Sequence, residues 1–172
     1  MGSGSSNSYS GTSGASQPYS AEYKVVPRMM SKDKADPDIY DPKTGYFRNP
    51  TAIKLKDSVS GNSIDFEGNH ANGDFTYVMN TNGEIVFGKR CNPNDGRKRS
   101  PHPTLIGGKD PKVQCAGIIN FRNGKIYSVN NNSGHYRPNI KSLDKVNNAL
   151  QKMCNDNPRL FDRRSEWRKN NE

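Results

Sequence analysis

Two stretches of the chain pair β-branched and aromatic runs around an Asn-Gly dipeptide. Residues 75–80 (FTYVMN) and 84–88 (EIVFG) flank Asn82-Gly83, whereas residues 116–121 (AGIINF) and 125–129 (KIYSV) flank Asn123-Gly124. Asn-Gly favours a tight hairpin turn because these residues tolerate positive φ. The pattern therefore predicts two β-hairpins, which together make a four-stranded antiparallel sheet. Ile64 and Phe66 indicate a further strand.

Apolar residues recur at helical spacing in two other segments. The first set follows the helix-start pair Asn49-Pro50 and consists of Ala52, Leu55 and Val59. The second set begins after a capping Ser142 and consists of Leu143, Val146, Leu150 and Met153. A short helix near Trp167 is expected to end the chain. The predicted fold class is α+β, an antiparallel sheet built from two Asn-Gly hairpins with helices packed on one side.

The composition changes sharply near residue 22. Residues 1–22 are rich in Gly and Ser and are expected to be flexible, because they hold too little apolar surface to offset their ordering entropy. Residues 23–172 are expected to form a single basic α+β domain. The first residues also match the Met-Gly-x-x-x-Ser pattern for N-myristoylation, which a Gly/Ser-rich segment meets easily.

The charge balance points to an anionic partner. The chain carries 26 basic and 17 acidic residues, a net charge of +9, so nucleic acid, and RNA above all, is the first candidate. An acidic membrane surface is second, and simple solubility is the alternative. Seven of the basic residues and only two acidic ones fall between residues 89 and 112. Arg97 and Arg99 in this loop are candidate phosphate-binding residues.

The cysteines and the hydropathy limit the remaining classes. Cys91, Cys115 and Cys154 are widely spaced and form no C-x-x-C pair, so neither a zinc site nor a disulfide scaffold is expected. Cys115 and Cys154 are predicted to be small buried apolar residues. No apolar run reaches about 18 residues and no secretory signal is recognised, so we expect no membrane span. The protein is expected to act in the cytoplasm, its own or that of a target cell.

The strongest candidate chemistry is a pair of histidines in dense motifs. His102 lies in residues 101–108 (PHPTLIGG) and His135 in residues 133–138 (SGHYRP). The predicted hairpin between the motifs returns the chain to its start, so the two imidazoles are expected to converge. Imidazole titrates near neutral pH, which suits a general acid and a general base. Pro103 is expected to keep His102 out of a helix.

Polar residues near the histidines complete a candidate phosphoryl site. Tyr136 is assigned to the catalytic group, and the remaining donors are Thr104, Lys109, Ser133 and Arg137. No metal and no cofactor are expected. The alternative interpretation is structural, with His102 bonded to a backbone carbonyl and His135 fixing a strand-to-helix corner. His70 is interpreted as an ordinary loop histidine.

The motifs HPTLIGGKDP and SGHYRPN resemble a C-terminal domain of bacterial polymorphic-toxin and phage-associated proteins. The resemblance covers about residues 1–155, and a looser form of the pattern occurs in effector-like and calmodulin-binding plant proteins. Toxin domains of this size often resemble small metal-independent ribonucleases, so the resemblance implies an RNA substrate. It also implies a cognate immunity protein as a partner.

Three hypotheses of function follow. In a metal-independent ribonuclease, one histidine takes the ribose 2′-hydroxyl proton and the other protonates the leaving 5′-oxygen, while Lys109 or Arg137 stabilises the phosphorane. An ADP-ribosyltransferase-like toxin is disfavoured because many need a glutamate near the ribose, and none falls between residues 85 and 165. A non-catalytic module that binds nucleic acid or protein is the third hypothesis.

Overall fold

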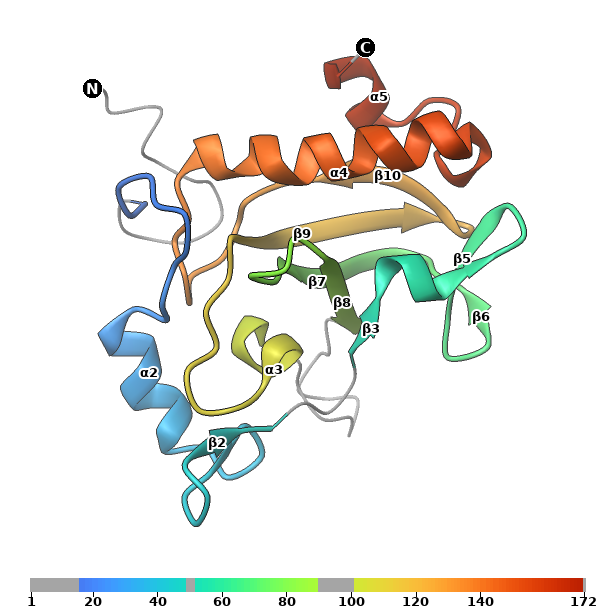
Figure 1. Ribbon diagram of the computed structural model, residues 1–172. Coiled ribbons are helices and arrows are strands. Elements are labelled where there is room, and N and C mark those ends of the chain that lie inside the picture. The colour runs from blue at the N-terminus through green and yellow to red at the C-terminus, as the bar shows by residue number, and fades with distance from the viewer. Residues whose placement is uncertain (1–15, 49–51, 90–100, 172) are drawn as a thin grey trace.

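A five-stranded antiparallel sheet forms the centre of the protein (Figure 1). The computed structural model describes residues 16–48, 52–89 and 101–171. The strand order is β10-β9-β7-β8-β3, and the strands are β3 (Ile53–Lys54), β7 (Gly73–Met79), β8 (Ile85–Lys89), β9 (Cys115–Arg122) and β10 (Lys125–Val129). The α+β class and the antiparallel sheet are thus confirmed.

Both Asn-Gly pairs lie at hairpin turns. Asn123 and Gly124 have φ of 49° and 79°, as a two-residue turn with mirror-image geometry requires. Gly83 alone has positive φ in the first hairpin, and the Asn80 N–H donates to the Glu84 carbonyl across a three-residue loop. The hairpins join through β7 and β9, which pair along their length from Gly73 with Phe121 to Met79 with Cys115.

Helices lie on both faces of this sheet, whereas the sequence predicted them on one. Helix α4 (Leu143–Asp156) places Val146 and Leu150 in the main core, together with α5 (Glu166–Asn171). Alternate strand residues point to the opposite face, where Val78 and Ala116 pack against Leu105 of α3 (His102–Ile106). The N-terminal segment covers the same face, because Tyr23 pairs with Val113 before α2 (Pro27–Lys34) begins.

Residues 52–60 contain no α-helix, so the helix predicted from Ala52, Leu55 and Val59 is wrong. The chain forms strand β3, a 3₁₀ turn η1 (Leu55–Ser58) and strand β4 (Val59–Ser60). Leu55 is buried but Val59 is 37% exposed, so the two residues do not share a buried face. The pair Asn49-Pro50 lies outside the described residues.

Short elements complete the architecture. Ile64 and Phe66 do form a strand as expected, but in a separate three-stranded sheet. The remaining elements are β1 (Tyr40–Asp41), β2 (Tyr46–Phe47), β5 (Ser63–Phe66), β6 (Asn69–His70), η3 (Ile140–Ser142) and η4 (Pro158–Leu160). No helix in residues 16–48, 52–89 or 101–171 is long and apolar enough to cross a membrane.

The predicted burial of two cysteines is confirmed. Cys115 and Cys154 are both buried, as predicted, and burial raises the pKa of Cys115 to about 11. Cys91 lies outside the described residues.

The N-terminal segment contacts the domain earlier than the sequence predicted. The Gln17 N–H donates to the Arg137 carbonyl at 2.6 Å, so contact with the domain begins before the boundary predicted at residue 23.

Candidate functional site

The two histidine motifs meet in space, as the intervening hairpin predicted. The ring centroids of His102 and His135 lie 6.4 Å apart, and the ring planes are inclined at 57°. Strands β9 and β10 carry the chain from α3 to the end of the sheet and back to residue 133. Both side chains are buried, with 6% and 9% of the residue surface exposed.

His102 begins helix α3, so the prediction that Pro103 keeps it out of a helix is wrong. In the helix interior proline removes an N–H donor and clashes with the carbonyl four residues earlier, but neither cost applies at Pro103, which lies in the first turn. The Thr104 N–H donates to the Pro101 carbonyl at 2.9 Å, and the Thr104 hydroxyl donates to the same oxygen at 2.7 Å. The helix then ends after Ile106 at Gly107, which has φ of 70°.

The hydrogen bonds of His102 fix both its orientation and its tautomer. Its Nε2 lies 2.8 Å from the Gly117 carbonyl oxygen, which only accepts, so Nε2 carries the proton. In the neutral ring Nδ1 then accepts from the Ser133 hydroxyl at 3.1 Å. The Ser133 oxygen in turn accepts from the Tyr136 N–H at 3.3 Å. A continuous chain of hydrogen bonds therefore links α3, β9 and the 133–138 motif.

His135 is held by an aspartate that the sequence analysis did not single out. Its Nε2 lies 3.0 and 3.2 Å from the two carboxylate oxygens of Asp33. Asp33 is the buried residue of α2 and lies 102 positions away along the chain. The His135 carbonyl also accepts from the Val26 N–H at 2.8 Å, just before α2 begins. His135 thus anchors α2 to the corner that follows β10. No local sequence pattern connects two residues so far apart.

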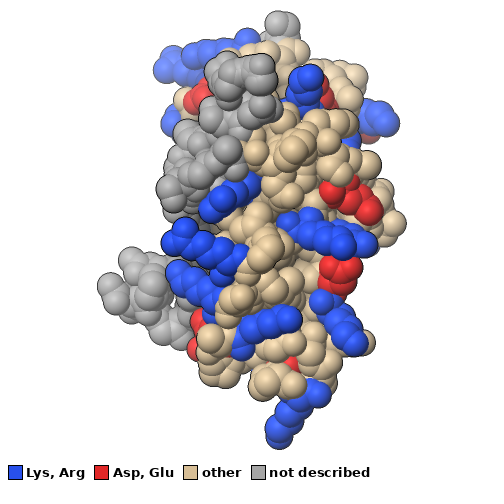
Figure 2. All heavy atoms as spheres, turned by 90° about the vertical axis from the view of Figure 1, so that its left-hand side faces the viewer, with Lys and Arg blue, Asp and Glu red and all other residues tan. Residues whose placement is uncertain are grey.

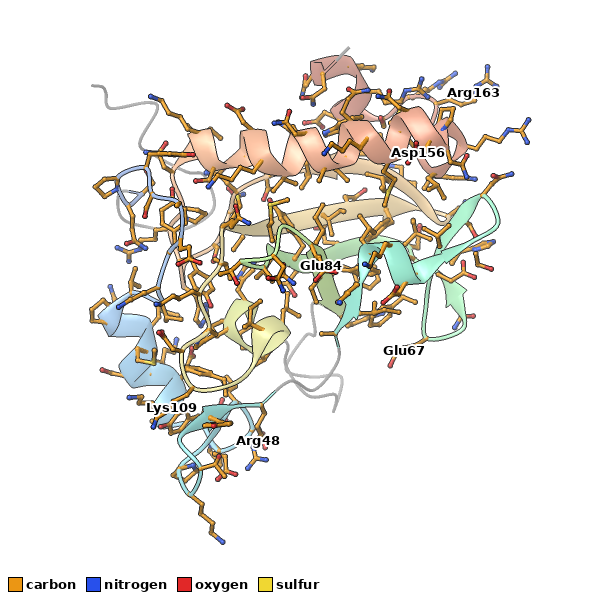
Figure 3. The ribbon with its side chains drawn as sticks, viewed as in Figure 1. Arg48, Glu67, Glu84, Lys109, Asp156 and Arg163 are labelled. Atoms are coloured by element: carbon orange, nitrogen blue, oxygen red, sulfur yellow. The ribbon has the colours of Figure 1, made fainter. Side chains whose placement is uncertain are left out.

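The other predicted catalytic and binding residues divide into buried and exposed groups. Tyr136 is fully buried and its hydroxyl donates to the Pro111 carbonyl. Burial, followed by the charges of Asp33 and Asp110, raises the pKa of Tyr136 well above its usual value. Arg137 has φ of 44°, in the left-handed region. Lys109 is exposed near α2, at the lower left of Figure 3.

Two of the predicted phosphate-binding residues lie at the histidines: Thr104 shares helix α3 with His102, and Ser133 contacts His102 directly. Thr104 and Ser133 use their hydroxyls inside the protein, as described above. Arg97 and Arg99 lie outside the described residues. A pocket of about 330 Å³ is lined by Asp33 and by exposed parts of α2, and neither histidine lines it. An acid–base pair must present a proton and a lone pair to a substrate, whereas the described contacts of His102 occupy both nitrogens. This geometry favours a structural corner.

The surface around the N-terminal segment is strongly basic. Figure 2 shows this side of the molecule, where Lys and Arg outnumber Asp and Glu. A hollow of about 410 Å³ is lined by Lys24 and Lys112 together with Glu22. Lys145 reaches the same segment, since its Nζ lies 3.3 Å from the Ala21 carbonyl and 5.2 Å from the centre of the Tyr19 ring.

Two further observations bear on identity. Among the described residues, no group of three or more His, Cys, Asp or Glu side chains could hold a metal ion. A scan against protein-family models and searches of curated proteins and of solved structures find no match to this chain.

Proposed function

We propose that this domain binds single-stranded RNA through the surface formed by Tyr19, Lys24, Arg28, Lys32, Lys112 and Lys145, here called the basic face. The observation that carries the proposal is the exposure of Tyr19 beside a lysine. Its ring is 52% exposed and lies beside Lys145. Proteins that bind single strands combine basic side chains for the phosphates with exposed aromatic rings on which bases stack.

Several residues of the basic face are linked by described contacts. Lys145 contacts the segment of Tyr19, and Lys24 and Lys112 share one hollow. Helix α2 follows directly and exposes Arg28 and Lys32. Acidic residues also lie beside these groups: Glu22 lines the hollow with Lys24 and Lys112, Asp36 lines a pocket with Lys32, and Asp110 pairs with Lys112 at 3.4 Å. The basic residues still prevail, which supports attraction of a polyanion.

The choice of RNA rests on the resemblance of the histidine motifs to toxin domains. A second exposed ring, Tyr46, is 51% exposed on β2. β2 pairs with the segment of Lys109 through Phe47 and Gly108. Exposed rings at two positions favour unpaired bases over a duplex, whose bases are already stacked.

Binding of a labelled oligoribonucleotide over a salt series tests this proposal. Tyr19→Ala is expected to weaken binding by about 1–3 kcal/mol, whereas Tyr19→Phe keeps the ring and binds normally. Lys24→Gln with Arg28→Gln should flatten the slope of log K against log salt by about 1.4 if both contact phosphates. A charge-matched control is Lys152→Gln with Lys169→Gln, two exposed residues outside the basic face. Equal losses in both pairs would contradict the proposal.

The second candidate function is metal-independent RNA cleavage, and the observation that favours it is the 6.4 Å separation of the two imidazoles. Asp33 would hold His135 as the base and His102 would protonate the leaving oxygen. Because both rings are buried, α2 would have to move before RNA could reach them.

Incubation of the protein with RNA in the presence of a chelator tests the cleavage candidate. Products with 2′,3′-cyclic phosphate ends, lost in a His135→Gln variant that still binds RNA, would establish it. Binding without any cleavage would leave the binding function alone.

A further inference from the structure

A hollow lined by arginines lies at the far end of α4 from the basic face. Its volume is about 610 Å³, and its basic lining residues are Lys125, Arg159, Arg163, Arg164 and Arg168. Figure 3 shows Arg163 beyond the end of α4, in the same corner as Asp156. Asp162 is the one acidic residue among those that line the hollow. We call this feature the arginine hollow.

The backbone that carries these arginines is firmly fixed. The Asp162 N–H donates to the Ile126 carbonyl at 3.0 Å, and Phe161 forms a bridge with the same residue of β10. The Phe161 ring packs on Trp167 of α5 with centroids 4.9 Å apart. The Asn157 side chain donates to Asn62 at 3.1 Å and thereby holds the opposite rim. The guanidinium groups therefore extend from a preformed frame.

Three of the arginines have no internal counter-ion within the described ranges. No described carboxylate lies within 4.0 Å of the guanidinium group of Arg159, Arg163 or Arg164, whereas Lys54 and Lys56 both pair with Glu84. Asp162 directs an oxygen to the Arg164 backbone N–H at 2.8 Å. Positive charges held together in this way repel one another, and a bound anion relieves that repulsion.

We propose that the arginine hollow binds the phosphomonoester of a nucleotide, either as a free nucleotide or as the 5′ end of a nucleic acid strand. The planar guanidinium fork donates paired hydrogen bonds to phosphate oxygens. A monoester carries about 1.5–2 negative charges at neutral pH, against one for a backbone diester. A hollow of about 610 Å³ also exceeds the size of a phosphate alone, and the exposed ring of Pro158 supplies apolar surface for the sugar or base.

This site is independent of the basic face. The 14 residues of α4 separate the two regions, which corresponds to about 20 Å of helix. A concave site of this size also suits a single nucleotide better than the flat surface of an anionic membrane.

Trp167 provides the readout, because it is the only tryptophan of the chain and packs on Phe161. The full chain is titrated with adenosine 5′-monophosphate, with adenosine, and with a short oligoribonucleotide that carries either a 5′-phosphate or a 5′-hydroxyl. We expect the monophosphate to change the fluorescence and adenosine to have no effect. In the Lys24→Gln with Arg28→Gln variant, tighter binding of the 5′-phosphorylated strand than of both the 5′-hydroxyl strand and the free nucleotide identifies a strand end as the ligand. Tighter binding of the free nucleotide identifies a small nucleotide.

Arg163→Gln with Arg164→Gln is expected to weaken monophosphate binding by about tenfold or more. The charge-matched control, Lys152→Gln with Lys169→Gln, and the basic-face pair, Lys24→Gln with Arg28→Gln, should change it by less than about twofold. Calorimetry confirms the constants, and circular dichroism confirms that each variant is folded. The absence of monophosphate binding, an equal loss in the control pair, or binding to anionic vesicles alone would overturn the proposal. None of these results depends on whether the basic face binds RNA.

Discussion

Replacing His102 with alanine is expected to destabilise the whole fold. The imidazole is 6% exposed and bonds to the Gly117 carbonyl and to the Ser133 hydroxyl. Removing the ring leaves two buried polar groups without those partners and opens a cavity between α3 and the sheet. The sequence alone predicts instead that the fold stays intact after this substitution, because His102 lies on no periodic apolar face.

The magnitude follows from these contacts. Each buried polar group that loses its partner costs about 1–3 kcal/mol, and the lost volume adds a cavity term. Two such groups cost about 2–6 kcal/mol before the cavity is counted, so the total is at least about 3 kcal/mol, a large part of the roughly 5–15 kcal/mol that stabilises a typical domain. For a chain of 172 residues this corresponds to a fall in Tm of about 10 °C.

Urea and thermal unfolding followed by circular dichroism measure the effect. His102→Gln keeps an amide N–H that can reach the Gly117 carbonyl and should recover part of the loss. His70→Ala is the matched control, because that ring is 61% exposed and its loss should cost less than about 1 kcal/mol. An unfolding free energy of His102→Ala within about 0.5 kcal/mol of the original protein would refute the structural role.

Further substitutions test other parts of the fold. Asp33→Ala and His135→Ala should each cost about 3–5 kcal/mol, because each leaves a buried partner alone, and a double-mutant cycle should give a coupling energy above about 1 kcal/mol. Gly117→Ala should cost about 3 kcal/mol or more in urea unfolding, since its Cβ would lie 1.9 Å from the Asn130 carbonyl oxygen. Hydrogen bonds from Asn80, Lys54 and Lys56 lower the pKa of Glu84 from 4.5 to about 2. The stability that this carboxylate contributes is therefore complete above about pH 4.5 and lost as the pH falls towards 2. Acid titration of Glu84→Gln should show a shallower loss.

The hairpins were predictable because their signals are local. Asn123 and Gly124 specify the turn through their own backbone preferences, and the flanking residues fill both faces of the sheet. The pairing of β7 with β9 follows from two hairpins that share one core. The fifth strand of the sheet, β3, has only two residues, too few for a recognisable strand pattern. Its place at the sheet edge depends on β8, which no local rule reveals.

The sequence predicted one helix that does not exist and missed another, α2. Leu55 and Val59 fit a helical period, yet the pairing of β3 with β8 determines the local structure, and tertiary contact overrides a weak periodicity. Helix α2 was missed for another reason: its one fully buried residue is Asp33, and its apolar residues Met29 and Met30 are only partly buried against the core. A search for an apolar stripe therefore misses it. Proline at its first position is the one local sign that a helix begins there.

The convergence of the two histidines was predictable from the hairpin, but their burial was not. A dense run of Gly, Pro and hydroxyl residues indicates that the backbone there has a specific shape. It does not indicate whether that shape forms a catalytic site or a buried structural corner. Only 30% of this chain is apolar, against about 45–50% (a count that includes glycine) in an average domain. Part of the corner between α2, α3 and β9 is accordingly built from His102, Ser133, His135 and Asp33. Such a corner needs partners for most of its polar groups, although the buried Arg137 Nε has no hydrogen-bond partner among the described residues. The need for partners accounts for motifs as dense as those of an active site. The exposed arginines and Tyr19 are free of that requirement, and for this reason binding is placed on the surface and not at the histidines.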